Sequence, residues 1–221
     1  MNVISPTETR VEMTFAVPLL VRRIQDCAAT NEGLQQIILE HEAKESGTTK
    51  SNFGGWHSDG NMLKWEGEPV AQLRRWIDEA IQHISRMPKQ GKPDDGKRVK
   101  FAATAWANIN RDGNYNNLHN HPRQHWALVY YVALGTETPG VKNNGRLEIR
   151  DPRPGSRFYN PPGFKFGVSK IVTPEPGMLL IFPAWVEHWV HPFRGTGERI
   201  SIACNIRVTD EPGGKKKSDY D

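Results

Sequence analysis

Three histidines have the residue type and spacing expected of metal ligands. His119 and His121 stand two residues apart in the run NLHNHP, and His188 follows in the run FPAWVEHWV. In a strand, residues i and i+2 point to the same face, roughly 7 Å apart, so two imidazoles can converge on one ion. A third ligand can then come from a neighbouring strand. Imidazole nitrogens suit iron, zinc, copper or nickel better than calcium or magnesium.

The third ligand has two candidates in the sequence. His191 stands three residues after His188 and precedes a proline, where the backbone is extended, so either ring could face inward. We favour His188, because Trp185, Trp189 and Val190 would surround it with apolar side chains that exclude water. Three protein ligands leave coordination positions open, as a catalytic metal site requires.

Arg199 opens a segment, 199–208, in which polar and apolar residues alternate. In a strand this alternation separates two faces, and the isoleucine face must pack against a core. The opposite face, with Arg199 and Ser201, either meets solvent or lines a polar pocket. If it lines a pocket, the guanidinium can bind a carboxylate through two hydrogen bonds, and Ser201 adds a hydroxyl donor.

Two further segments carry polar groups that could line the same pocket. Asn108 shares a strand face with Trp106 and Asn110, and asparagine is disfavoured inside strands. A polar pocket would explain this pattern, and an exposed or edge strand is the alternative. Tyr131, the second residue of a Tyr-Tyr pair, either reaches a bound molecule or packs in the core.

The surrounding sequence predicts the elements that must position these residues. Two helices are expected early in the chain, over 31–45, with Thr30 or Asn31 as a cap, and over 68–86, where apolar residues form one continuous stripe. Short strands separated by glycine and proline turns follow, over 99–110, 125–134, 145–150, 168–173, 177–183 and 199–208. This order predicts a mainly β fold, a sandwich or jelly roll with flanking helices on one side.

The helices have no core of their own, so we expect one domain over 1–210, with a flank over 1–98 and a jelly-roll core over 99–208. The loop 151–167 is long and rich in proline, which is typical of loops that cover active sites. Residues 211–221 have the composition of a disordered tail.

Composition restricts the remaining possibilities. The formal charge is +4, but part of the excess lies in the lysines at 215–217, so we expect a solvated basic surface and no nucleic-acid partner. No apolar run approaches the roughly 20 residues that span a bilayer, and the N-terminus lacks the pattern of a secretory signal. Two distant cysteines read as free thiols. We therefore expect a cytoplasmic protein, of a size that allows a homodimer.

The order and spacing of several motifs resemble the iron(II)- and 2-oxoglutarate-dependent oxygenases, and more narrowly a group from marine bacteria and phages with the run His-x-His-Pro. The motifs are His119-x-His121, Tyr130-Tyr131, Gly145-x-Leu147, Asp151-Pro152, Pro176-Gly177-x-Leu179-x-x-Phe182-Pro183, His188-x-Val190 and Arg199-x-Ser201. The resemblance covers roughly residues 100–208. It implies a double-stranded β-helix, with His188 as the distal iron ligand and Arg199 as the anchor for the distal carboxylate of 2-oxoglutarate.

One position departs from the family pattern. The wider superfamily binds iron through His-x-Asp or His-x-Glu and a later histidine, whereas this chain has His121 at the second position. Glu148, Asp151 and Glu187 are nearby carboxylates, but none has the expected spacing. Three-histidine iron sites occur in related β-barrel oxygenases, so the departure is compatible with activity.

The leading hypothesis is an iron(II)- and 2-oxoglutarate-dependent dioxygenase that hydroxylates a small molecule or a peptide. His119, His121 and His188 would hold the iron, and Arg199 and Ser201, with Tyr131 or Asn108, would hold 2-oxoglutarate. One alternative is a cupin-like three-histidine metalloenzyme without 2-oxoglutarate, in which Arg199 binds the substrate's acid group. The other is a jelly-roll protein that binds metal without catalysis.

Overall fold

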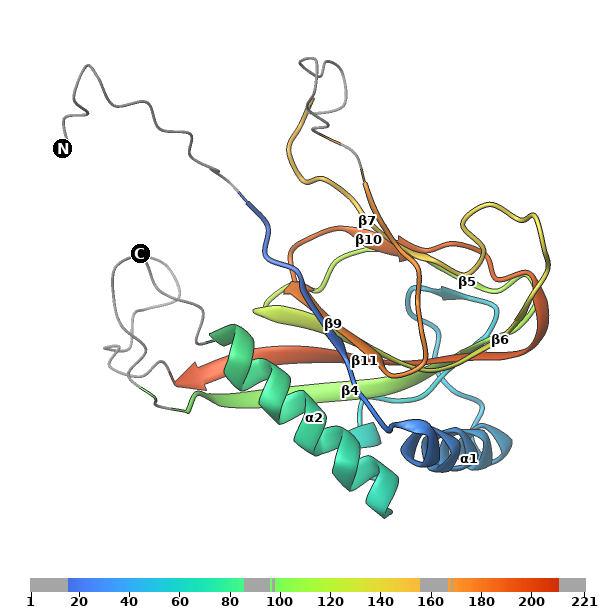
Figure 1. Ribbon diagram of the computed structural model, residues 1–221, viewed down its shortest axis with the longest axis horizontal. Coiled ribbons are helices and arrows are strands. Elements are labelled where there is room, and N and C mark those ends of the chain that lie inside the picture. The colour runs from blue at the N-terminus through green and yellow to red at the C-terminus, as the bar shows by residue number, and fades with distance from the viewer. Residues whose placement is uncertain (1–15, 86–95, 97, 156–166, 168, 211–221) are drawn as a thin grey trace.

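The computed structural model describes residues 16–85, 96, 98–155, 167 and 169–210. Two antiparallel sheets face each other, and two helices lie along the outer face of the larger sheet (Figure 1). The larger sheet has the order β1 (Leu20–Arg23), β9 (Met178–Pro183), β6 (Trp126–Glu137), β11 (Gly195–Asp210), β4 (Lys100–Asn110) and β3 (Trp56–His57). This arrangement is the predicted double-stranded β-helix with flanking helices.

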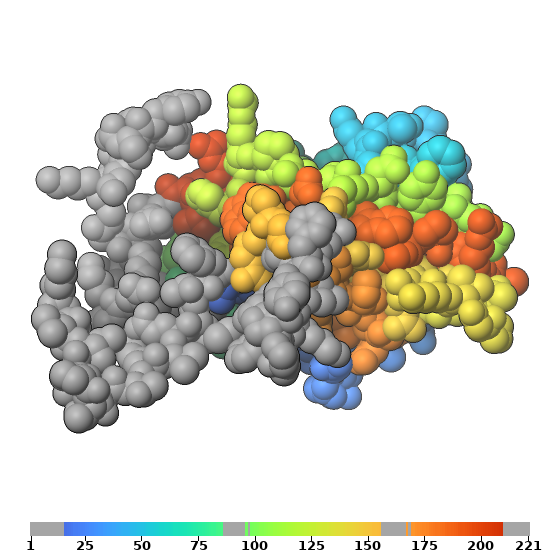
Figure 2. All heavy atoms as spheres, turned by 90° about the horizontal axis from the view of Figure 1, so that it is seen from above, coloured from blue at the N-terminus to red at the C-terminus, as the bar shows by residue number. Residues whose placement is uncertain are grey.

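The smaller sheet carries two of the three histidines. Its order is β2 (Asn52–Phe53), β5 (Tyr115–His119), β10 (His188–Val190), β7 (Leu147–Ile149) and β8 (Lys170–Val172). Viewed from above, the segments around β2, β5, β10 and β7 follow one another in this order, from cyan through green and orange to yellow (Figure 2). The strands are short, so the sheet covers only part of its larger neighbour.

Helices α1 (Ala28–Lys44) and α2 (Glu68–Ser85) close one core against the larger sheet. The predicted apolar stripe of α2 is buried there, together with alternate residues of β11, namely Ile200, Ile202 and Ile206. A short 3-10 helix, η1 (Met62–Lys64), adds the buried side chain of Met62 to the same core. No helix among the described residues is long and apolar enough to cross a membrane.

A second core lies between the two sheets. Neighbouring residues of one strand serve opposite cores, because successive side chains of a strand alternate between faces. Tyr130 packs toward the helices, whereas Tyr131 belongs to the core between the sheets, and Leu179 and Leu180 divide in the same way. The inter-sheet core also contains Phe182. The polar side chains of β11, Arg199 and Ser201, lie on this side of the larger sheet and line the same pocket as Phe182.

The structure confirms the six predicted strands and both helices, with changes at their ends. α1 begins at Ala28, so neither Thr30 nor Asn31 is its cap, and that prediction was wrong. Asn31 instead lies inside the helix and accepts a hydrogen bond of 2.6 Å from the Tyr130 hydroxyl. The predicted tail over 211–221 and most of the loop 151–167 lie outside the described residues.

We expect Tyr130→Phe to destabilise the protein by about 1–3 kcal/mol, because it leaves the buried Asn31 carbonyl without its donor. Urea unfolding followed by circular dichroism measures the change. Tyr115→Phe is the matched control, because this half-buried tyrosine of β5 donates no hydrogen bond to the described residues, and it should cost little. Equal losses in the two variants would contradict the assignment.

Candidate metal centre

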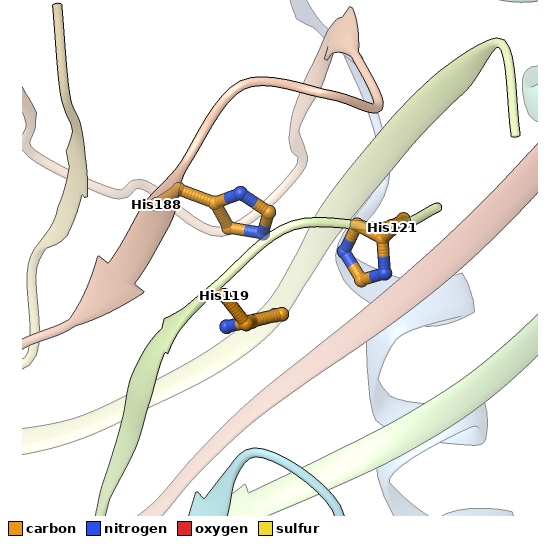
Figure 3. Close-up of side chains that lie close together, drawn as sticks. All are labelled: His119, His121 and His188. Atoms are coloured by element: carbon orange, nitrogen blue, oxygen red, sulfur yellow. The ribbon is translucent and has the colours of Figure 1, made fainter. Parts of the chain in front are cut away.

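The pairing of β5 with β10 places His119 opposite His188. These two residues are partners in the antiparallel register, His119 at the end of β5 and His188 at the start of β10. His121 lies in the loop after β5, where its backbone N–H donates to the Ala184 carbonyl at 2.8 Å. The three rings face a common point (Figure 3), and one nitrogen from each lies within 4.8 Å of the other two.

Main-chain hydrogen bonds orient two of the three rings. His119 Nδ1 lies 2.6 Å from the Asn117 carbonyl, and His188 Nδ1 lies 2.9 Å from the Val186 carbonyl. A carbonyl oxygen only accepts, so Nδ1 carries the proton in both rings. The Nε2 lone pair of each ring is then available to a metal, which is the tautomer that a ligating histidine requires.

Burial keeps the three imidazoles neutral. Loss of hydration lowers the pKa of His188 to about 3 and that of His121 to about 4, and His119 adds repulsion to both. The pKa of His119 is lowered by burial as well, although the hydrogen bond to Asn117 opposes the shift. Neutral nitrogen donors are therefore present at physiological pH without prior loss of a proton.

The reasons given for two of the sequence predictions need correction. His121 is not on a strand, so the rule for residues i and i+2 does not explain why the rings converge; the turn after β5 does. Trp185 does not shield His188, because it is 54% exposed. The shielding ring is Phe182, whose centroid lies 4.8 Å from that of His188.

His191, the rival third ligand, points elsewhere. Its Nε2 atom lies 2.8 Å from a Glu148 carboxylate oxygen, and its ring lies 3.9 Å from that of Trp189. The other two candidate carboxylates are also engaged, Asp151 with Arg153 at 2.6 Å and Glu187 with Arg150 at 3.5 Å. Among the described residues, the metal-ligating cluster contains histidines alone.

Arg199 lies in the pocket that the three histidines line. It is 2% exposed, its Nε atom donates to the Gly145 carbonyl at 2.9 Å, and Nη1 donates to the Ser201 hydroxyl at 3.4 Å. No carboxylate of the described residues lies within 4.0 Å of the guanidinium. Burial lowers the pKa of Arg199, but an arginine side chain stays charged. A buried cation without a counter-ion favours an anionic ligand.

Two buried oxygen atoms beside Arg199 make no hydrogen bond of regular geometry with the described part of the chain, although one of them interacts with the Arg199 guanidinium. They are the Tyr131 hydroxyl and the Asn108 side-chain carbonyl, and both residues line the pocket. Burial raises the pKa of Tyr131 although Arg199 opposes the shift, so the phenol keeps its proton. Unsatisfied buried polar atoms are costly. A bound polar molecule would satisfy them, as the prediction of a polar pocket requires.

Sequence reasoning missed some residues of this pocket. Asn116 and Ser51 also line it, and Asn116 Oδ1 accepts a hydrogen bond of 3.3 Å from Asn110. The signal was present in the asparagine-rich run NYNN, but the segment Tyr115–His119 was not recognised as a strand. Alternation counted from His119 would have placed Asn116 on the outer face; a β-bulge between the pairs His119–His188 and Asn116–Val190 brings both residues to the pocket.

The family comparison agrees with this geometry. Residues 104–205 match the model of a family described as "Putative 2OG-Fe(II) oxygenase". This segment, slightly less than half of the chain, is therefore similar to the 2OG-Fe(II) oxygenases. The matched residues include the three histidines and Arg199. The narrower group from marine bacteria and phages stays a prediction.

Solved structures support the oxygenase fold. A prolyl-4-hydroxylase from Pseudomonas putida is 16% identical, with a TM-score of 0.63, covering 87% of this chain and 93% of that one. A Trichoplax adhaerens prolyl hydroxylase in complex with a peptide fragment is 11% identical, with a TM-score of 0.60 and coverage of 86% and 83%. HygX from Streptomyces hygroscopicus, solved with nickel and 2-oxoglutarate, is 11% identical, with a TM-score of 0.57 and coverage of 87% and 83%. The curated proteins contain no significant match.

We expect the metal-free oxygenase to lose stability as the pH falls below about 6.5. Unfolded histidines titrate near 6.5, whereas burial holds His188 at a pKa of about 3 and His121 at about 4, so the unfolded state binds more protons in this window. Urea unfolding at pH 7.5 and at pH 5 measures the effect. His188→Gln should show a smaller loss between the two pH values, and a pH-independent wild type would contradict the shifts.

Proposed function

We propose that the oxygenase holds iron(II) through His119, His121 and His188, binds 2-oxoglutarate at Arg199, and hydroxylates a small molecule or a peptide. One observation carries the proposal. Three neutral imidazole nitrogens lie within 4.8 Å of one another in the same pocket as a buried guanidinium that has no counter-ion among the described residues. A metal would bind the three imidazole nitrogens, and an acidic co-substrate would neutralise the guanidinium.

The residues fit the metal. Three imidazoles suit iron(II), and three protein ligands leave positions for a co-substrate and dioxygen. When bound, the iron supplies oxygen activation coupled to conversion of 2-oxoglutarate to succinate and carbon dioxide, with one oxygen atom going to succinate and one to the substrate. Phe182 packs against His188 and limits the access of water to the ligands.

The residues also fit the co-substrate. Arg199 keeps Nη2 and part of Nη1 for a carboxylate, because Nε is already held by the Gly145 carbonyl. Ser201 and the Tyr131 hydroxyl can donate to the same carboxylate, and Asn108 lies beside them in the pocket. The structural relative HygX has 2-oxoglutarate bound, which supports this assignment.

Anaerobic addition of iron(II) and 2-oxoglutarate tests the proposal. We expect a weak visible charge-transfer band only when both are present, and succinate formation once oxygen and a suitable substrate are added. Arg199→Ala should abolish the band at 2-oxoglutarate concentrations that saturate the wild type. Arg207→Ala, an exposed arginine of the same strand, is the matched control and should keep it. Iron binding without the band would favour the cupin-like alternative.

We expect Gly145→Ala to weaken 2-oxoglutarate binding by about tenfold or more, because it displaces the anchor. Gly145 has φ +58, and an added Cβ atom would lie 3.2 Å from Arg199 Cδ and 3.3 Å from Phe193. Gly140→Ala is the control, since Gly140 also has a positive φ of +79 but nothing lies within 4 Å. Calorimetric titration of both variants separates loss of the anchor from backbone strain, and equal affinities would contradict the assignment.

We also propose that the protein is cytoplasmic and forms a homodimer. Cys27 and Cys204 are both free thiols, which supports the cytoplasm as the compartment. The size of the chain allows a homodimer, and size-exclusion chromatography with light scattering would decide its assembly.

A further inference from the structure

The charges around the pocket are unbalanced. Of the residues that line it, Arg199 is the cation, three are neutral histidines, and none is an aspartate or glutamate. Glu137 is the acidic residue whose field acts on Arg199, and it is exposed. Solvent screens such a group strongly. The described part of the chain therefore supplies positive charge to the pocket and no buried negative charge.

Binding of metal and co-substrate leaves this imbalance in place. A divalent metal and the Arg199 guanidinium bring three positive charges, and the 2-oxoglutarate dianion offsets two of them. The histidine ligands add none, whereas an acidic residue at position 121 would offset the third. An uncompensated charge in a buried site is costly, so a further anion should be attracted to it.

Hydrogen-bond donors for such an anion are present on β5 and just before β2. Asn110 donates to Asn116 Oδ1 at 3.3 Å, which leaves the Asn116 Nδ2 group without a partner among the described residues. Asn116 is 7% exposed and lines the pocket with His119. The Ser51 hydroxyl lies in the same lining and adds a second donor. Asn116 lies toward Arg199, because its hydrogen-bond partner Asn110 pairs with Arg199 between β4 and β11.

We propose that the oxygenase acts on an acidic substrate, and that a singly charged group such as a carboxylate enters the pocket that the three histidines line. The inference rests on the proposed function, because the charge count includes a bound metal and a bound 2-oxoglutarate. It identifies the chemical class of the substrate. His121 then determines substrate selectivity, because it is neutral where an acidic residue would offset the third positive charge.

Acetate and acetamide test the inference, because they have nearly the same shape and differ in charge. The protein is loaded with manganese(II) and 2-oxoglutarate, and the relaxation rates of the probe methyl protons are titrated by NMR. Failure of this loading would contradict the proposed function itself and is seen before any probe is added. In the loaded wild type, we expect acetate to bind at least about tenfold more tightly than acetamide.

Three variants each add one carboxylate, at a different position in the protein. His121→Asp places the missing charge in the ligand set, and Asn116→Asp places it in the lining with little change of shape. Both should reduce the preference for acetate to about threefold or less, and Asn116→Asp decides alone if His121→Asp fails to fold or to retain manganese. Leu118→Asp is the control, because Leu118 is 43% exposed, and it should keep the preference.

Three results would overturn the inference. The first is equal binding of acetate and acetamide to the loaded wild type. The second is loss of the preference in Leu118→Asp to the same extent as in the two pocket variants. The preference would then depend on the charge of the protein surface and not on the charge inside the pocket. The third is release of 2-oxoglutarate by acetate at the concentrations that saturate the effect, because the anion would then occupy the co-substrate position.

Discussion

The antiparallel contact between β5 and β10 is the interaction on which the centre depends. It pairs His119 with His188, although 68 residues separate them in the chain, and so turns two distant motifs into one metal-binding arrangement. Neither strand is long enough to be stable alone, and both depend on β7 and on the core between the sheets. The chemistry of the protein therefore depends on the smaller and less extensive of its two sheets.

The larger sheet makes this possible through the alternation of its strands. Each of β6, β9 and β11 presents one face to the helices and the other to the inter-sheet core, so the helices can stabilise the sheet without approaching the pocket. Arg199 is buried for the same reason that Ile200 is: both are part of a strand covered on both sides. A charge in this position is tolerated where a ligand compensates it.

Much of this arrangement could be predicted from periodicity. The alternation over 199–208 separated the pocket face from the helix face, the apolar stripe of α2 identified its buried side, and the order of the motifs indicated the family. Two features were beyond reach. β5 and β10 span five and three residues, too few for a periodic signal, and β5 is rich in asparagine. The turn that brings His121 to the other rings depends on a contact with Ala184, which is distant in sequence.

The acceptors that orient His119 and His188 belong to the main chain two residues earlier, at Asn117 and Val186. In many metal sites a side chain performs this role, and a single substitution can remove it. A carbonyl group is the same for every residue type, so no exchange of the Asn117 or Val186 side chain deletes either acceptor. Substitutions at positions 117 and 186 therefore leave the orientation of these two rings unchanged. The surrounding pocket can change in sequence toward new substrates while both imidazoles keep the same orientation.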